Sequence, residues 1–280
     1  MANREQIQYE DRLIVFMDLL GFSNAVKHSE NQNVEELTER IYSIIDFFSV
    51  QESVNAINNR IKDGLDKQFE VYFKMKGTPE AVYDNPLSAA KEITFFSDCL
   101  VISCKKEKKN NGYLKFLMGL NNMLFNVISK GFLLRGGMTY GKLFHKNNQC
   151  FGPAMLKAYY LENNVANYPR IIVDKAAVAE LNNYGLNNYL IKDKIDGIDL
   201  FDYLSQKAYF EENDNYHDFE GNRLDYNQFL KNLKILITDN LEQYNDNERV
   251  LIKYQWYKEY YNDTIKKVLC QEQQDEFLIK

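Results

Sequence analysis

Apolar runs and segments of helical periodicity alternate along the first two thirds of the chain. Residues 12–17 are mostly apolar and stop abruptly at Asp18, and a Gly-Phe-Ser sequence begins at Gly21. This pattern predicts a buried strand that leads through a turn into a capped helix. Apolar side chains recur at steps of three and four residues within 34–50 and again within 114–127, which predicts further helices there.

Two hairpins are predicted among these helices. Residues 93–103 form two apolar runs on either side of Ser97 and Asp98, which is the pattern of two strands joined by a tight turn. Residues 132–145 are strand-like, and Lys146-Asn-Asn148 supplies the turn of a second hairpin. The glycines inside 132–145 indicate close approach of backbone or of a ligand.

Two helices and three more strands complete this part of the chain. Gly152-Pro153 begins the first helix, residues 168–173 form a buried strand, residues 176–181 form a short helix, and residues 189–204 form two short strands. Strands that alternate in this way with helices and hairpins predict an α/β (α+β) fold of the ferredoxin-like kind, with an antiparallel sheet.

The pattern changes near residue 206. A polar stretch is followed by two helices, each with one apolar stripe, and the polar link 245–247 joins them, so a C-terminal helical hairpin is predicted. We therefore divide the chain into a main domain at 1–205, with a polar surface insertion at 51–90, and a helical appendage at 206–280.

Composition narrows the possible functions. The 280 residues carry a formal net charge of −6, which argues against non-specific binding of nucleic acid, because such binding requires a basic surface. The four cysteines form no Cys-x-x-Cys pair and are expected to be free thiols in a reducing compartment. The chain opens with polar residues rather than a signal peptide, and no apolar run is long enough to cross a membrane, so a cytoplasmic protein is expected.

Two acidic residues interrupt apolar runs and are the main candidates for chemistry. Asp18 ends the first strand, and Asp98 lies in the hairpin turn. If the two strands are neighbours, both carboxylates reach one edge of the sheet and can hold two Mg²⁺ or Mn²⁺ ions, which prefer oxygen ligands. Backbone amides at Gly21–Ser23 then offer a phosphate site at a helix start. The alternative for each acid alone is structural: a helix cap for Asp18 and a turn residue for Asp98.

Four segments resemble the motifs of class III nucleotidyl cyclases, in the order usual for that family. Residues 15–23 resemble the first metal motif, and residues 93–102 resemble the second metal hairpin. Residues 134–141 are similar to the strand that follows the family's long helix, and residues 152–158 are similar to the helix that carries its catalytic Asn and Arg. The resemblance covers about residues 11–175.

The resemblance implies a cyclase catalytic domain that converts a nucleoside triphosphate to a 3′,5′-cyclic monophosphate and pyrophosphate with two metal ions. It assigns metal contacts to Asp18, Leu19 and Asp98. It assigns nucleotide contacts to a larger group of residues, namely Leu19, Leu20, Gly21, Phe22, Ser23 and Thr94. In this family two chains pair head to tail with active sites at their interface, so a homodimer is implied.

The chain departs from the family pattern where the base and the transition state are recognised. Thr94 stands where the family commonly has the Lys or Glu that reads a purine. Leu156 and Tyr160 stand where the family has its catalytic Asn and Arg. Lys157 and Arg135 are the cations that we expect to act in catalysis instead. The alternatives are an ordinary surface lysine for Lys157 and a structural ion pair for Arg135.

These departures resemble those of divergent bacterial cyclases of the Pycsar antiphage group, which make cyclic CMP or cyclic UMP. The shared string is Gly-x-Ala-x-x-x-Ala-Tyr-x-Leu-Glu from Gly152 to Glu162, followed by Tyr-Pro-Arg-Ile at 168–171. The resemblance implies a pyrimidine substrate, UTP or CTP. It also implies a separate effector that the cyclic nucleotide activates in antiviral defence.

Two other functions stay open. Loss of the Asn and Arg favours a cyclase-like fold that senses nucleotide without turnover, whereas retention of both acids opposes it. A palm-type polymerase or cyclic-oligonucleotide synthase shares the two-Asp geometry, but its Gly-Gly-Asp-Asp/Glu turn is missing around Asp98. A phosphate loop of the Gly-x-x-x-x-Gly-Lys-Ser/Thr kind is missing as well, and the three histidines lack zinc-site spacing.

Overall fold

The structure is a computed structural model, and it describes residues 8–31, 38–39, 41–44, 91–106, 112–146, 148–207 and 225–280. The predicted insertion at 51–90 lies outside the described residues. Of the helix predicted at 34–50, the described residues are helical, and Ile41 and Ile44 are buried in the core.

Four strands form the centre of the sheet. In chain order they are β1 (Glu10–Leu20), β2 (Lys91–Phe96), β3 (Cys99–Lys105) and β4 (Leu133–Lys146). Their spatial order is β2-β3-β1-β4, and each neighbouring pair is antiparallel. Helix α1 (Phe22–Asn31) follows the first strand and α4 (Gly112–Ser129) follows the third. This is the β-α-β-β-α-β arrangement, so the predicted ferredoxin-like α/β fold is confirmed.

Short strands extend the sheet beyond β4. β6 (Ile171–Val173) lies parallel to β4, and β8 (Asp199–Phe201) and β7 (Leu190–Lys192) continue the sheet in antiparallel pairs. β5 (Gln149–Phe151) pairs with the end of β4 and forms the predicted second hairpin. The connections contain α5 (Pro153–Asn164), α6 (Lys175–Asn183) and the 3₁₀ turn η2 (Asn187–Tyr189).

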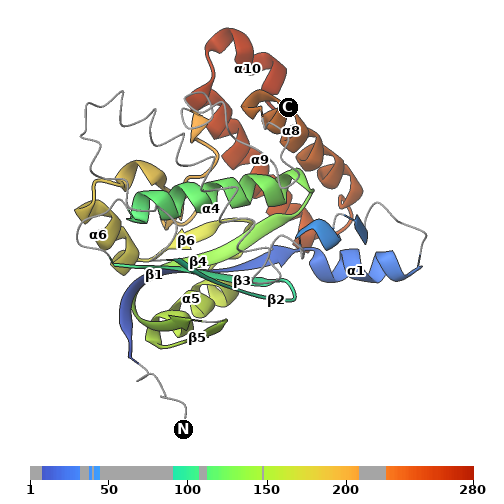
Figure 1. Cartoon of the computed structure of the whole chain (residues 1–280). Coiled ribbons are helices and arrows are strands. Elements are labelled where there is room, and N and C mark those ends of the chain that lie inside the picture. The colour runs from blue at the N-terminus through green and yellow to red at the C-terminus, as the bar shows by residue number, and fades with distance from the viewer. Residues whose placement is uncertain are drawn as a thin grey trace.

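Alternation along β1 divides the core between the two faces of the sheet. Leu13, Val15 and Met17 face the larger core, to which α4 contributes. Ile14 and Phe16 face a smaller core that includes alanines of α5. Figure 1 shows α4 on one side of the sheet and α5 on the other. Because both faces are covered, this strand has a continuous apolar run rather than an alternating pattern.

The close contact between α5 and the sheet depends on Gly137 of β4. A Cβ atom added to Gly137 would lie 2.5 Å from the Cβ of Leu161 and 2.6 Å from the carbonyl oxygen of Ala158. Any side chain at this position would therefore push the helix away from the strand. The close approach predicted for the glycines of this strand is confirmed here, and the approaching partner is α5.

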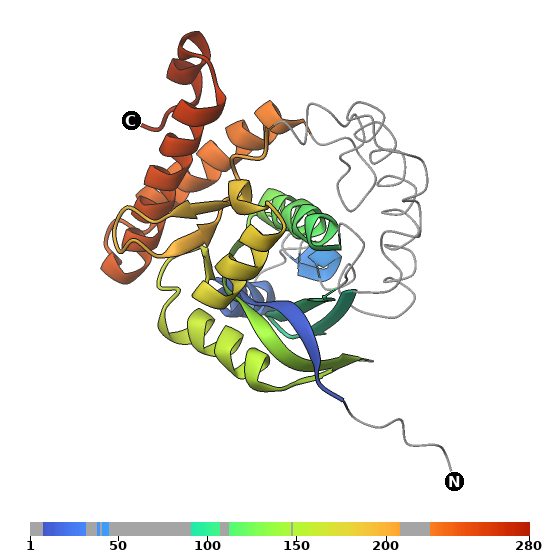
Figure 2. The same cartoon turned by 90° about the vertical axis from the view of Figure 1, so that its left-hand side faces the viewer.

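In the described residues that follow the sheet, the chain forms three helices: α8 (Tyr226–Gln243), α9 (Glu248–Val268) and α10 (Gln271–Phe277). The first two form the predicted hairpin, whereas α10 was not predicted. The ring of Phe125 on α4 meets Phe229 on α8 edge to face, with 4.5 Å between centroids, so these helices share the larger core. Figure 2 shows α8 and α9 beside the edge of the sheet that β7 and β8 form. Among the helices in the described ranges, none has the length and apolar character needed to span a membrane.

Candidate metal and nucleotide site

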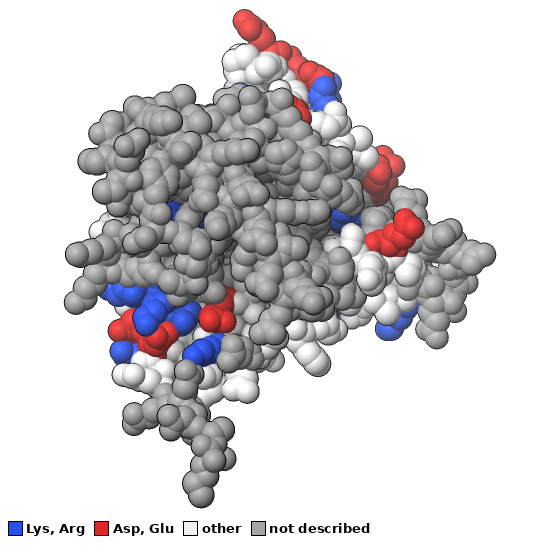
Figure 3. Space-filling view, in the orientation of Figure 1, with Lys and Arg blue, Asp and Glu red and all other residues white. Residues whose placement is uncertain are grey.

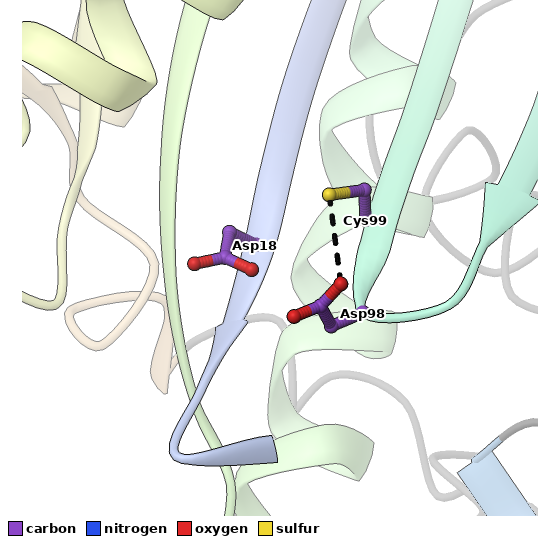
Figure 4. Close-up of side chains that lie close together, drawn as sticks. All are labelled: Asp18, Asp98 and Cys99. Atoms are coloured by element: carbon purple, nitrogen blue, oxygen red, sulfur yellow. Dashed lines mark hydrogen bonds between the residues drawn. The ribbon is translucent and has the colours of Figure 1, made fainter. Parts of the chain in front are cut away.

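Asp18 and Asp98 lie next to each other at one end of the sheet. Asp18 pairs in register with Cys99 across β1 and β3, and Cys99 directly follows Asp98. The backbone N–H of Leu19 donates to the carbonyl oxygen of Asp98 at 2.9 Å, which ties the hairpin turn to β1. Ser97 completes the turn with a φ of 57°, in the left-handed region. Figure 4 shows both carboxylates beside the same space between the strands.

The donor set at this position fits a hard divalent cation. Ligand atoms of Asp18, Asp98 and Cys99 all lie within 4.8 Å of one another. Two carboxylates suit Mg²⁺ or Mn²⁺. The thiol does not suit them: it donates to Asp98 Oδ1 at 3.8 Å, and burial followed by the charges of Asp18 and Asp98 raises the pKa of Cys99 to about 12. Cys99 therefore stays protonated beside the two candidate ligands.

An ion pair between β4 and α5 borders the two acids. Arg135 Nη2 lies 2.5 Å from Glu162 Oε1 and 3.4 Å from Asp18 Oδ2. Burial, and then the negative charges of Glu162 and Asp98, raise the pKa of Asp18 to about 6, although Arg135 acts in the opposite direction. This excess of negative charge favours a bound cation at the same end of the sheet.

Glu162 belongs to this cluster, although no role in the site was predicted for it. Its side chain is only 5% exposed. Ala154 and Ala158 precede it at steps of four residues, and both are buried. Residues at this spacing share one helix face, so the face of α5 that packs on the sheet continues to Glu162. A charged residue on such a face requires a partner, and this was the signal available in the sequence.

The predicted phosphate cradle follows directly after β1. Gly21 has a φ of 84° and turns the chain into α1, where Ala25 N donates to Gly21 O at 2.9 Å. Phe22 is buried, 6.3 Å from Phe132 between ring centroids, which fixes the start of the helix, and Ser23 is exposed. A phosphate bound at the start of α1 would therefore contact mainly the backbone N–H groups of the first turn, which have no acceptor within the helix. The predicted contacts on this segment are Leu19, Leu20, Gly21, Phe22 and Ser23.

Thr94 of β2 ends a chain of hydrogen bonds that starts at Arg12. Arg12 Nη1 donates to Ser103 Oγ at 3.2 Å, Ser103 Oγ lies 2.8 Å from His145 Nδ1, and His145 Nε2 lies 3.0 Å from Thr94 Oγ1. Burial, and then the charge of Arg12, lower the pKa of His145 to about 4, so the ring is neutral. Ser103 keeps its own proton while it accepts from Arg12, so it can donate to His145 Nδ1, and in that tautomer the Nε2–H of His145 donates to Thr94.

Lys157 is not brought to the two acids within one chain. It is exposed on α5, and its ammonium lies 5.5 Å from the centroid of the Tyr160 ring. Leu156 and Tyr160, which occupy the positions of the family's Asn and Arg, are 72% and 52% exposed. The structure therefore gathers Asp18, Asp98, Arg135 and the cradle, and it leaves Lys157 in an exposed patch with Leu156 and Tyr160.

Outside this site, a hollow of about 700 Å³ lies between the β7–β8 hairpin and α9. Ile191, Leu200 and Trp256 are among its lining residues, and none of the predicted site residues is. Elsewhere, acidic and basic side chains of neighbouring strands pair, as Lys142 and Asp11 do at 2.9 Å. Figure 3 shows the two charges intermixed at the lower left of its view.

The sequence matches no protein-family model, and no curated protein matches it. Among solved structures, the monomeric guanylyl cyclase domain of the RhoGC fusion protein from the aquatic fungus Blastocladiella emersonii is similar, with a TM-score of 0.38 and 11% identity over 69% of this chain and 95% of that chain. The catalytic core of a rhodopsin-guanylyl cyclase with converted specificity, in complex with ATPαS, has a TM-score of 0.36 and 11% identity over 69% and 94%. Similarity this low carries no information about the activity of this chain.

Proposed function

We propose that this protein is a metal-dependent nucleotide cyclase of the class III type. The observation that carries the proposal is the convergence of Asp18 and Asp98 from antiparallel strands, held by the hydrogen bond from Leu19 to Asp98. Two carboxylates within reach of one cation, beside a helix start, suit a nucleoside triphosphate with Mg²⁺ or Mn²⁺. The products would be a 3′,5′-cyclic monophosphate and pyrophosphate.

The side chains divide the work of this reaction. Asp18 and Asp98 would hold two metal ions, which when bound lower the pKa of the ribose 3′-hydroxyl and neutralise the triphosphate. Arg135 is oriented by Glu162 and would stabilise charge on the phosphoryl oxygens while the 3′-oxygen attacks the α-phosphorus in line. Backbone amides at Gly21–Ser23 would donate hydrogen bonds to the phosphate oxygens.

Thr94 supports a pyrimidine substrate. It offers a short hydroxyl where a purine-reading cyclase has a long charged side chain. In the tautomer whose Nε2–H donates to Thr94, the hydroxyl proton of Thr94 is available for an acceptor on the base. A uracil ring presents a carbonyl oxygen at the position where cytosine presents an amino group. We therefore favour UTP over CTP as the substrate.

The proposal includes a head-to-tail homodimer. The exposed side chains of Leu156, Lys157 and Tyr160 on α5 form a patch that suits a protein contact, and in such a dimer Lys157 would reach the partner's phosphates. As the Pycsar resemblance implies, the cyclic product would act as a second messenger that activates a separate effector in antiviral defence.

Product analysis tests the proposal. The full chain is incubated separately with ATP, GTP, CTP and UTP in the presence of Mn²⁺, and products are identified by mass. Cyclic UMP is the expected product. A cyclic purine nucleotide would keep the cyclase and refute the pyrimidine preference. Nucleotide that binds but is not converted would reject the cyclase in favour of a nucleotide sensor. Leu156 and Tyr160 favour this alternative, because they stand where the family has its catalytic Asn and Arg.

A further inference from the structure

The inner face of α9 changes from aromatic to cationic toward its N-terminal end. Trp256, Tyr260 and Thr264 follow one another at steps of four residues, and all three are buried. Lys253 lies three residues before Trp256, and Arg249 lies four residues before Lys253. Residues three and four apart share one helix face, so the two cations continue the buried stripe beyond the core.

A buried cluster around Arg170 fixes the position of this stripe against the sheet. Trp256 Nε1 donates to Asp193 Oδ2 at 2.9 Å, and Asp193 forms a buried ion pair with Arg170. The carbonyl oxygen of Arg170 accepts from Gly136 N at 2.9 Å, and Gly136 directly follows Arg135 in β4. Trp256 is therefore anchored next to the strand that carries Arg135, and the preceding turn of α9 is held near it.

The charge on that preceding turn acts on the candidate site. Burial first, and then the charges of Arg135 and Arg249, lower the pKa of Lys253, and the charge of Asp18 acts in the opposite direction. Within the described ranges, the half-buried ammonium of Lys253 forms no hydrogen bond or ion pair. A half-buried ammonium in this position, between the candidate metal ligand Asp18 and two arginines that repel it, suits an anion that enters the site.

We propose that Lys253 binds the triphosphate of the substrate, so that the C-terminal helix α9 supplies a cation to the active site of its own chain. Arg249, which is exposed one turn earlier, would lie at the outer end of the same phosphate path. The inference rests on the proposed function, because it takes a triphosphate as the ligand. Lys253 would also supply positive charge within one chain. Tyr160, which stands at the position of the family's Arg, cannot supply this charge.

The test is calorimetric binding of inorganic triphosphate to the full chain with Mn²⁺, combined with turnover of the nucleotide that the wild type uses. Lys253→Gln removes the charge and is expected to weaken triphosphate binding and to raise KM by roughly tenfold or more. Lys253→Arg restores a cation and is expected to bind within a few-fold of wild type. Lys266→Gln is the matched control, because Lys266 is exposed on the same helix, about 20 Å along its axis.

The outcomes separate this inference from the proposed function. Equal triphosphate affinity in Lys253→Gln and Lys266→Gln would overturn the role of Lys253, even if the wild type is a cyclase. If only Lys253→Gln weakens triphosphate binding and the wild type forms no cyclic product, the binding role of Lys253 is supported and the proposed cyclase activity is rejected. Absence of triphosphate binding by the wild type would overturn the role of Lys253, and absence of any cyclic product as well would overturn both proposals. If Lys253→Gln lowers the melting temperature, Lys253→Met, which keeps the apolar stem, takes its place.

Discussion

The backbone N–H of Leu19 donates to the carbonyl oxygen of Asp98, and this bond joins the residue after one candidate metal ligand to the other ligand itself. The strand register, which pairs Asp18 with Cys99, also places Asp18 next to Asp98. Two carboxylates that are far apart in the sequence are thus positioned by backbone hydrogen bonds. Their separation is set by the sheet before any ligand arrives, and such preorganisation is what a metal-assisted reaction requires.

Asp98→Asn is expected to abolish turnover while the fold is kept. The amide removes the negative charge that a metal ion needs, and asparagine is well tolerated in a turn. Product formation should fall by at least about a hundredfold, with an unchanged far-UV circular dichroism spectrum. Asp11→Asn is the matched control on β1, because Asp11 pairs with an exposed lysine away from the site. Turnover by Asp98→Asn at the wild-type rate would show that Asp98 is not a required metal ligand.

Cys99→Ser is expected to leave metal binding almost unchanged. The thiol is protonated at neutral pH because burial and the neighbouring carboxylates raise its pKa to about 12. Mn²⁺ affinity measured by calorimetry should therefore stay within about twofold of wild type. A loss of tenfold or more would show that sulfur is a ligand, and the site would then suit a softer metal ion.

Gly137→Ala is expected to destabilise the fold by roughly 1–3 kcal/mol, because the new Cβ overlaps α5 and forces the helix off the sheet. The measurement is urea unfolding at equilibrium. Gly141→Ala on the same strand is the control, since its Cβ would lie 3.5 Å from Ala154, an ordinary contact. Similar stability for the two variants would contradict the tight packing described for α5.

His145 is expected to make folding stability depend on pH. Its pKa is about 4 in the folded chain against an ordinary value of 6.5. As pH falls from 6.5 to 4, the unfolded chain gains a proton that the folded chain excludes, so this group lowers the free energy of unfolding, by roughly 3 kcal/mol across that window. His145→Gln lacks this titration. Urea unfolding at several pH values should show a shallower loss in the variant, and parallel curves would refute the assignment.

Much of the fold followed from periodicity in the sequence, and the site followed only in part. The strand that ends at Asp18 and the hairpin around Asp98 were visible because apolar runs stop at these acids. Cys99 enters the cluster through strand register, which the pattern does not specify. The role that we propose for Lys253 had no signal in the sequence, because this residue lies on a helix whose partner face is set by a distant cluster. The short helix α10 is largely polar, so it offered little apolar periodicity.

The buried cluster of Arg170, Asp193 and Trp256 also bears on how such a chain can evolve. Arg170 and Asp193 come from the part before residue 206, whereas Trp256 comes from α9. A recombinant that exchanged the C-terminal helices for those of another protein would inherit the buried carboxylate without its indole donor, which is costly. The two segments therefore form one unit of inheritance, and change in either is constrained by the other.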